Sequence, residues 1–492
     1  MDTQVFAPKV PDSAEWLAFQ PEIAAVLIGA AFMVWGAFGS SKKWAPYLGI
    51  FCFALLTAFS AWFNGYCPRA FGQEYDSFLG GMFGYPTLCW IFPLCGFLSA
   101  SMAVRYFRKL KEANAGEFLG IMFVACSALS LIVRADNLMA TFASLETSAI
   151  CFYALIAWGR RCAANLEGSI RYLILSGVSG AFLLLGIAFV YGASFECGVD
   201  LLYFKNFEYG DSALFYIGMA LAASALFFKL GAFPFQFWVP DVYAAAPAPV
   251  SAFLASASKC AAFFALFKLL GYMEYSEKIA LALGVCAAAG IVIGSLGGLG
   301  EKNAKRIVGF SGIVNAGYIM VFLASFYSIF SREAVSRDAV VLMFLTMSLF
   351  AISYVLSVYG VLMVQNFYAG ADDSRVEISD YNSLKLERPS STAALAIALG
   401  SLAGVPPTAG FFAKLFVLVA AYMAGIYWLM FVLIAGSAAS VYYYFKWMRE
   451  AYTPASGGAK IKFEAEGMAN ALLMAVSLAS LMAGVYFFSK MI

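Results

Sequence analysis

The sequence predicts an all-α polytopic membrane protein with about fourteen transmembrane helices, and three observations lead to this class. Of its 492 residues, 63% are hydrophobic and only 12% are charged, about half the charged share of a soluble globular domain. Apolar runs of about 20 residues, the length that crosses a bilayer, recur from one end of the chain to the other. The stretches between these runs are too short to enclose a hydrophobic core of their own.

Hydropathy and helix-breaking residues set the limits of each predicted span. In chain order, the predicted spans are 21–39, 46–64, 84–106, 117–134, 137–158, 169–192, 212–238, 247–270, 279–299, 304–328, 339–365, 392–424, 427–448 and 468–489. We divide them into an N-terminal three-helix segment (1–116), two five-helix units (117–270 and 279–450) and a C-terminal helix (451–492).

Basic residues outside the spans indicate the orientation of the chain. Lys and Arg lie mainly in the loops that follow odd-numbered spans, as at Lys42, Lys43, Arg160 and Arg161. The positive-inside rule places those loops in the cytoplasm and therefore both termini on the outer side of the membrane. The N-terminal segment is net acidic, so we expect no cleaved signal peptide. The net charge of +2 gives no indication of a nucleic-acid partner.

Four ionisable side chains fall near the middle of predicted spans, where an ionised group costs at least about 2.5–3.5 kcal/mol. They are Glu146, Lys229, Lys259 and Lys414. Snorkelling to the interface is the alternative, and we assign it only to Lys268 and Lys490, which lie near span ends. Burial and a neighbouring carboxylate act in opposite senses on the protonation of a lysine. A glutamate beside a line of lysines therefore indicates a proton relay.

Helix-breaking residues accompany two of these lysines. Pro234 follows Lys229 in span 7, and Pro406 and Pro407 precede Lys414 in span 12. A single kink would favour ordinary packing, but broken spans carrying a central charge are typical of transporter sites. Because the breaks are five spans apart, we expect two inverted five-helix repeats, spans 4–8 and 9–13, with helices 7 and 12 broken.

Other polar residues carry weaker signals. Glu167 and Arg171 are spaced i and i+4, as an ordinary surface helix pair would also be. Lys305 begins span 10, where it is either functional or an interface anchor. Glu22 is expected at the membrane interface. The chain has no histidine and its ten cysteines form no Cys-x-x-Cys pair, so we expect no metal, haem or iron–sulfur cluster.

Six segments resemble the antiporter-like membrane subunits of respiratory complex I. The longest, FKLGAFPFQFWVPDVYAAAPAPVSAFLASASK (228–259), is similar to the broken seventh helix and the eighth helix of that family, and most similar to its N-type members. The others are FASLETSAICFYAL (142–155), EGSIRYLILSGVSGAFLLLGIAFVYG (167–192), KRIVGFSGIVNAGYIM (305–320), SLAGVPPTAGFFAKLF (401–416) and YYYFKWMREAY (442–452). M-type members have a glutamate where this chain has Lys414, and L-type members have a long lateral helix that it lacks.

The resemblance implies roles for the central residues. Glu146 matches a glutamate that pairs with the lysine at 229, Lys259 matches a connecting lysine, and Lys414 matches a lysine facing the exit route. Lys305 falls on the Lys-Arg pair of the family. Three positions depart from the family pattern, with Gln236 and Asn315 in place of histidines and Arg171 in place of a lysine. An amide does not titrate, and an arginine effectively never deprotonates.

The resemblance also implies a function and a setting. We expect a proton-translocating subunit of a complex I-type NADH:quinone oxidoreductase in a bacterial inner membrane, surrounded by lipid and by M-type and small K-, J- and A-type subunits. Flavin, iron–sulfur clusters and quinone would belong to partner subunits, with none in this chain. The alternatives are an Mrp-type cation/proton antiporter subunit, or the equivalent subunit of a ferredoxin- or hydrogenase-linked relative.

Overall fold

The computed structural model confirms the predicted all-helical class. It describes residues 20–38, 44–70, 88–109, 114–135, 137–159, 163–199, 201–202, 204–271, 273–331, 337–369, 376–454 and 467–491. Apart from turns, helices account for these residues, and one isolated bridge joins Asn303 to Glu377. The loop residues that set the predicted orientation (Lys42, Lys43, Arg160 and Arg161) and the side chain of Lys490 lie outside the described part of the chain.

The helices of the first half follow the predicted spans. They are α2 (Gln20–Phe38), α3 (Ala45–Ala70), α6 (Ile91–Lys109), α7 (Ala115–Arg134), α8 (Leu138–Ile156), α9 (Ala163–Cys197) and α10 (Ala213–Leu230), with short 3₁₀ turns at Ala157–Gly159 and Phe204–Tyr209. Several begin where a side chain accepts a hydrogen bond from the first turn, as Asn137 does from the N–H of Ala140 at 2.7 Å. Such caps satisfy N–H groups that the helix leaves free.

The second half contains shorter pieces. Its helices are α11 (Trp238–Ala245), α12 (Ala248–Phe253), α13 (Lys259–Gly271), α14 (Glu277–Leu299), α15 (Ala304–Phe330), α16 (Arg337–Ala369), α17 (Leu384–Glu387), α18 (Pro389–Ala403), α19 (Ala409–Met423), α20 (Tyr427–Tyr452) and α21 (Gly467–Met491). A π-helical turn (Leu254–Ser258) joins α12 to α13, and a 3₁₀ turn covers Ile378–Tyr381. The predicted breaks are present: a loop separates α10 from α11, and another separates α18 from α19. Helix α11 begins at 238, where predicted span 7 was expected to end, so the broken helix extends further than predicted.

Eleven helical segments of the described chain are long and apolar enough to cross a membrane, with α12, the π turn and α13 together forming one of them. Four shorter apolar helices are added by α6, α18, α19 and the central part of α21. The long helices expose large apolar side chains, such as Leu27 of α2, Ile174 of α9 and Phe431 of α20. A surface that faces lipid has this composition. The chain is therefore a multi-pass membrane protein.

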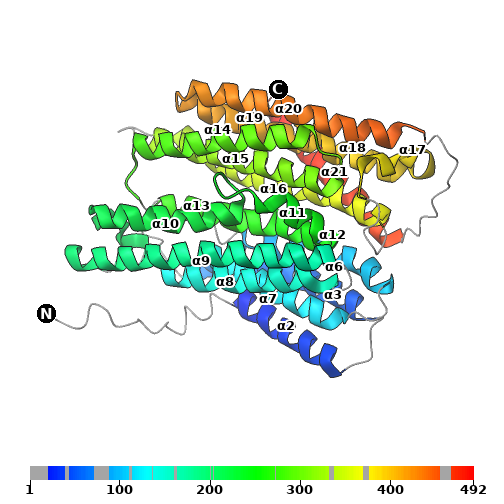
Figure 1. Cartoon of the computed structure of the whole chain (residues 1–492), viewed down its shortest axis with the longest axis horizontal. Coiled ribbons are helices and arrows are strands. Elements are labelled where there is room, and N and C mark those ends of the chain that lie inside the picture. Colours follow the sequence, from blue (N-terminus) through cyan, green and yellow to red (C-terminus); the bar gives the residue numbers. More distant parts are fainter. Residues whose placement is uncertain are drawn as a thin grey trace.

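The helices lie roughly side by side, from α2 and α7 along one edge to α19 and α20 along the other (Figure 1). The α12–α13 segment and α15 lie in the middle and are buried along almost their whole length. A charged residue on either of them therefore faces protein and not lipid. The two split spans run in opposite directions, because α10 leads to α11 from left to right and α18 leads to α19 from right to left (Figure 1).

Candidate functional site

The first broken helix ends its first half at a left-handed glycine. Gly231 has φ 71°, a conformation that costs an L-residue about 1–2 kcal/mol. The N–H of Ala232 then turns back to the carbonyl of Phe227 at 2.9 Å, which closes the end of α10. A cis peptide joins Phe233 to Pro234, and α11 starts at Trp238. The predicted break residue Pro234 thus lies in the loop between two half-helices.

The second broken helix uses the same backbone arrangement. Gly404, with φ 83°, ends α18, and the N–H of Val405 turns back to the carbonyl of Gly400 at 2.9 Å. A cis peptide joins Pro406 to Pro407. In both breaks the cis proline is the third residue after the glycine, so a single sequence spacing specifies the same interruption twice.

Lys229 lies two residues before the first break and is 1% exposed. Its Nζ donates to Ser148 Oγ of α8 at 2.7 Å and to the Tyr172 hydroxyl of α9 at 3.4 Å. It also lies 5.4 Å from the ring centre of Phe152. The amine is therefore held by neutral groups of two neighbouring helices.

Glu146 lies on α8, two residues before the serine that binds Lys229. Its side chain is partly exposed, but Oε1 is buried and accepts no hydrogen bond within the described residues. This oxygen lies against α9 at Gly180, where an added Cβ would come within 2.1 Å of it. The described residues contain no ion pair between Glu146 and Lys229, so the expected pairing stays a prediction.

Lys259 begins α13 directly after the π-helical turn and is 1% exposed. Its Nζ donates to the carbonyl of Gly312 on α15 at 2.5 Å and lies 5.8 Å from the ring centre of Tyr354. The amine packs against the bare backbone of residue 312, where an added Cβ would lie 2.6 Å from it and would displace it. A Cβ on Gly231 would lie 3.9 Å from the same amine, so Lys259 lies beside the first break.

Lys414 belongs to α19, the second half of the second broken helix, and is partly buried. Its Nζ reaches back across the break to the carbonyls of Leu402 at 2.7 Å and Ala403 at 3.1 Å. These carbonyls end α18, where the helix leaves acceptors free and the macrodipole attracts a cation. Nζ also lies 5.1 Å from the ring centre of Tyr318.

The remaining predicted residues are spread around these lysines. Lys305 is fully buried, and its Nζ donates to the carbonyl of Ala246 at the end of α11, 2.8 Å away. The amide of Asn315 donates to the carbonyl of Ser311 at 2.8 Å. Gln236, in the loop of the first break, is 1% exposed, and neither amide atom has a hydrogen-bond partner within the described residues.

Several buried polar atoms close in sequence or space to the central charges have no hydrogen-bond partner within the described residues. They include both amide atoms of Gln236, Oε1 of Glu146, Oγ of Ser258 and the hydroxyl of Tyr354. Buried polar groups in proteins are almost always hydrogen-bonded, and water supplies the bond where protein does not. We therefore expect water molecules to form hydrogen bonds with these buried polar atoms.

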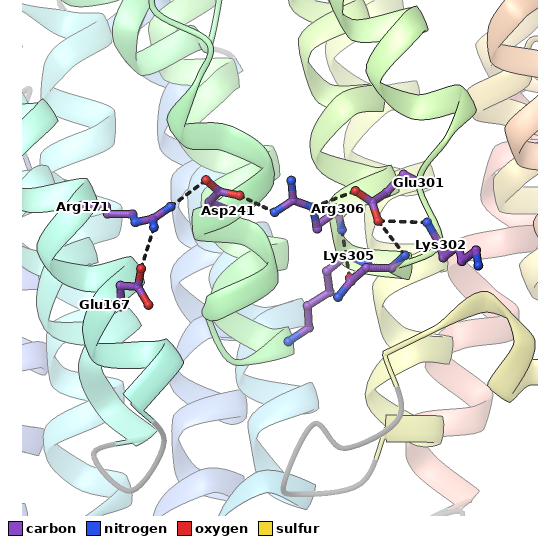
Figure 2. A network of polar contacts seen from close by, with 8 residues as sticks. Glu167, Arg171, Asp241, Glu301, Lys302, Lys305 and Arg306 are labelled. Carbon is purple, nitrogen blue, oxygen red and sulfur yellow. Dashed lines mark hydrogen bonds and ion pairs between the residues drawn. The ribbon is translucent and has the colours of Figure 1, made fainter.

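A chain of ion pairs lies at one end of the bundle (Figure 2). Glu167 binds Arg171 at 2.6 Å, and Arg171 binds Asp241 Oδ2 at 2.8 Å. The other oxygen of Asp241 binds Arg306, whose Nε lies 2.7 Å from Glu301 Oε2. The predicted pair of Glu167 and Arg171 is thus one end of a larger network.

Sequence reasoning missed three members of this network and the hydroxyl partners of Lys229. Asp241 follows Val-Pro in the sequence and resembles a helix-ending residue, and Arg306 resembles a membrane anchor. The one available signal was the proximity of Asp241 to the first break and of Arg306 to Lys305. Nothing in the sequence pairs Ser148 or Tyr172 with a lysine of another helix.

Comparison with known proteins establishes the family. Residues 135–440 match the protein family described as "NADH:quinone oxidoreductase/Mrp antiporter, TM". NADH-quinone oxidoreductase subunit N 1 of Opitutus terrae is 34% identical over 415 residues, covering 80% of each chain. The chain belongs to the subunit N family of NADH-quinone oxidoreductase. The predicted resemblance is confirmed.

Two solved structures share the fold of this subunit N family member. A chain of respiratory complex I from Thermus thermophilus, with bound aureothin, has a TM-score of 0.75 at 24% identity, covering 94% of this chain and 97% of that one. A chain of the Mrp complex from Dietzia sp. has a TM-score of 0.77 at 17% identity, covering 96% and 95%. Since both folds fit equally well, the fold alone does not separate the two kinds of complex, and the family assignment rests on sequence.

Proposed function

We propose that this subunit N family member is a proton-translocating membrane subunit of a complex I-type NADH:quinone oxidoreductase. The observation that carries the proposal is that Lys229, Lys259 and Lys414 donate to neutral oxygen atoms. Within the described residues, hydroxyl and carbonyl oxygens accept from all three amines, and no carboxylate forms an ion pair with them. Removing a proton from such an amine therefore breaks no ion pair with a carboxylate.

The proposed route runs from Glu146 through Lys229 and Lys259 to Lys414. The first break lies between Lys229 and Lys259 in the sequence, and its loop contains Gln236, whose amide has no hydrogen-bond partner within the described residues. Water bound there would connect the two amines by hydrogen bonds. Gln236 and Asn315 stand where the wider family resemblance implies histidines, so they would hold water and pass hydrogen bonds but store no proton.

The proposed architecture has fourteen spans. Adding α6, the broken pair α18–α19 and α21 to the eleven candidate spans gives this number. Spans 4–8 and 9–13 would form two inverted five-helix repeats, in 117–270 and 279–450, flanked by the segments 1–116 and 451–492. The matching breaks of α10–α11 and α18–α19, which run in opposite directions (Figure 1), support this division. Both termini would lie on the periplasmic side of the inner membrane.

The proposed setting is a respiratory complex. The chain would contact an M-type antiporter-like subunit, small K-, J- and A-type subunits and lipid. Redox chemistry would take place in other subunits, which would hold the flavin, the iron–sulfur clusters and the quinone. In response to that redox chemistry, the water content and the charge pairing along the proposed route in this chain would change.

The test replaces Lys229 in the assembled complex. In Lys229→Ala we expect proton pumping per NADH oxidised to fall severalfold while the complex still assembles, because the amine bonds other helices and closes no helix end. Glu146→Ala should have a smaller effect. Pumping is measured with a pH-sensitive dye in proteoliposomes, beside NADH oxidation in the same preparation. Full pumping in Lys229→Ala would exclude this lysine from the route.

An Mrp-type antiporter subunit is the second candidate, favoured by the equal fold similarity to the Mrp complex. The equivalent subunit of a ferredoxin- or hydrogenase-linked enzyme is a third. Gentle detergent extraction with a tag on this chain separates them. Co-purification with NADH-oxidising subunits supports the first proposal, co-purification with antiporter subunits alone supports the second, and a ferredoxin- or hydrogen-oxidising partner supports the third.

A further inference from the structure

The eight-residue helix α11 is held from two sides by charged side chains (Figure 2). On one side, Arg171 of α9 donates from Nη1 to Asp241 Oδ2 at 2.8 Å. On the other, Arg306 of α15 donates from Nη1 to Asp241 Oδ1. One carboxylate therefore joins three helices, and two of them, α9 and α15, belong to different proposed five-helix units.

The ends of α11 are fixed as well. Lys305, next to Arg306 in the sequence, donates to the carbonyl of Ala246 where α11 ends. At the other end, the indole N–H of Trp238 donates to the carbonyl of Phe228 in α10 at 3.0 Å. The two basic residues at the start of α15 thus contact opposite parts of the same helix.

The backbone contacts around α11 leave little room for movement. A Cβ on Gly168 of α9 would lie 2.3 Å from the Cβ of Ala245. A Cβ on Gly309 of α15 would lie 2.6 Å from the Cα of Pro240. Because both neighbouring helices approach α11 at a glycine, a small shift of either one is transmitted directly to it.

We propose that Asp241 is a positioning residue that clamps α11, and with it the loop of the first break, between the two five-helix units. The position of α11 can be tested without reference to transport, and only an effect of the clamp on pumping rests on the proposed function. An exposed ion pair contributes little by itself, and the Arg171 side chain is 51% exposed. Asp241 differs because it is 34% exposed, is shared by two arginines, and is backed by a further carboxylate behind each of them.

The clamp is tested by hydrogen–deuterium exchange of the purified complex carrying Asp241→Asn. Without the carboxylate, α11 keeps Lys305 and its packing but loses both arginines. We expect the N–H groups of 239 and 241–246 to exchange about threefold to tenfold faster. Those of α19, the second half of the other broken helix, should be unchanged. Asp241→Glu, which keeps the charge, should restore most of the protection.

Glu450→Gln is the matched control. It removes an ion pair of similar length, 3.0 Å to Arg449 at the end of α20, and should leave α11 unchanged. High salt gives a further readout, because 1 M salt shortens the Debye length to about 3 Å. Exchange of α11 should rise with salt in the natural chain and remain constant in Asp241→Asn.

Two results would overturn the clamp. One is equal exchange of α11 in the natural chain and in Asp241→Asn, and the other is a rise spread equally over both broken helices. Pumping per NADH oxidised is measured separately. If Asp241→Asn loosens α11 while Lys229→Ala pumps fully, the clamp stands and the proposed route through Lys229 fails.

Discussion

In the first broken helix the lysine precedes the break, and in the second it follows. Lys229 lies two residues before Gly231, whereas Lys414 lies ten residues after Gly404. The residue ten positions after Gly231 is Asp241, which takes the place of the lysine in this register. Two interruptions with the same glycine-to-proline spacing therefore carry opposite charges on their second halves.

The difference lies in which group closes the end of the first half-helix. In the first break, the neutral indole of Trp238 donates to the carbonyl of Phe228, so Lys229 is left to bind hydroxyls of other helices. In the second break, the amine of Lys414 donates to the carbonyls of Leu402 and Ala403. One lysine is thus part of the break that it accompanies, and the other is not. Identical backbone interruptions need not imply identical roles for the charges beside them.

The largest effect expected from this difference concerns the second break. Lys414→Ala removes both hydrogen bonds to the end of α18, at a cost of about 2–3 kcal/mol. Hydrogen exchange of 400–405 should therefore accelerate roughly 30- to 150-fold. Lys229→Ala is the matched control, because it removes no bond to α10, and exchange of Gly231 and Ala232 should change little. Equal loosening of both breaks would contradict the distinction.

A smaller effect is expected on thermal stability when the glycine of either break, Gly231 or Gly404, is replaced by alanine. Both φ values are left-handed, so alanine costs about 1–2 kcal/mol at each. At Gly231 the added Cβ also meets Val239 Cγ2 at 2.6 Å, while at Gly404 it meets the flexible Lys414 side chain at 3.0 Å. Gly231→Ala should therefore lower the heat-denaturation midpoint of the complex more than Gly404→Ala. A larger decrease of the midpoint in Gly404→Ala would contradict the prediction, because it would show that the backbone around Gly231 can move to accommodate the added Cβ.

The smallest effect concerns pH, at the charged clamp that only the first break has. Burial raises the pKa of Glu301, but hydrogen bonds from the N–H of Asn303, from Arg306 and from the N–H of Lys302 outweigh it, so the pKa lies below its ordinary value. A lowered pKa means that the contact stabilises the fold above the ordinary glutamate range and is lost only below it. Exchange of 302–306, corrected for intrinsic rates, should stay constant from pH 8 to about pH 5. Loosening within that range would contradict the assignment.

Signals that lie within one helix were predictable from the sequence. A lysine inside an apolar run, followed or preceded by glycine and proline, identifies both breaks without reference to any other part of the chain. The same local reasoning found the helices and the two breaks, but not the residues at which each half-helix ends and begins. Those limits follow from the left-handed turns at Gly231 and Gly404, because hydropathy continues through both breaks.

Contacts between helices were not predictable in this way. Glu22 was expected at the membrane interface, but the packing of α2 on α7 buries it against Arg134 at 2.9 Å and Ser130 at 2.5 Å. Lys268 was expected to snorkel, and its amine donates to the carbonyl of Ala135 at 2.7 Å. Each partner lies more than a hundred residues away in sequence. Only the three-dimensional arrangement of the helices determines which groups meet.

The bare backbone of Gly180 offers separate control over two properties that mutagenesis of an acid normally changes together. Replacing Glu146 by glutamine alters its charge and nearly preserves its shape. A methyl group at 180 would do the reverse, because it would occupy the space of the carboxylate oxygen and turn the ionised group aside. A pair of variants, one at each position, would therefore reveal whether transport depends on the existence of that negative charge or on its exact direction.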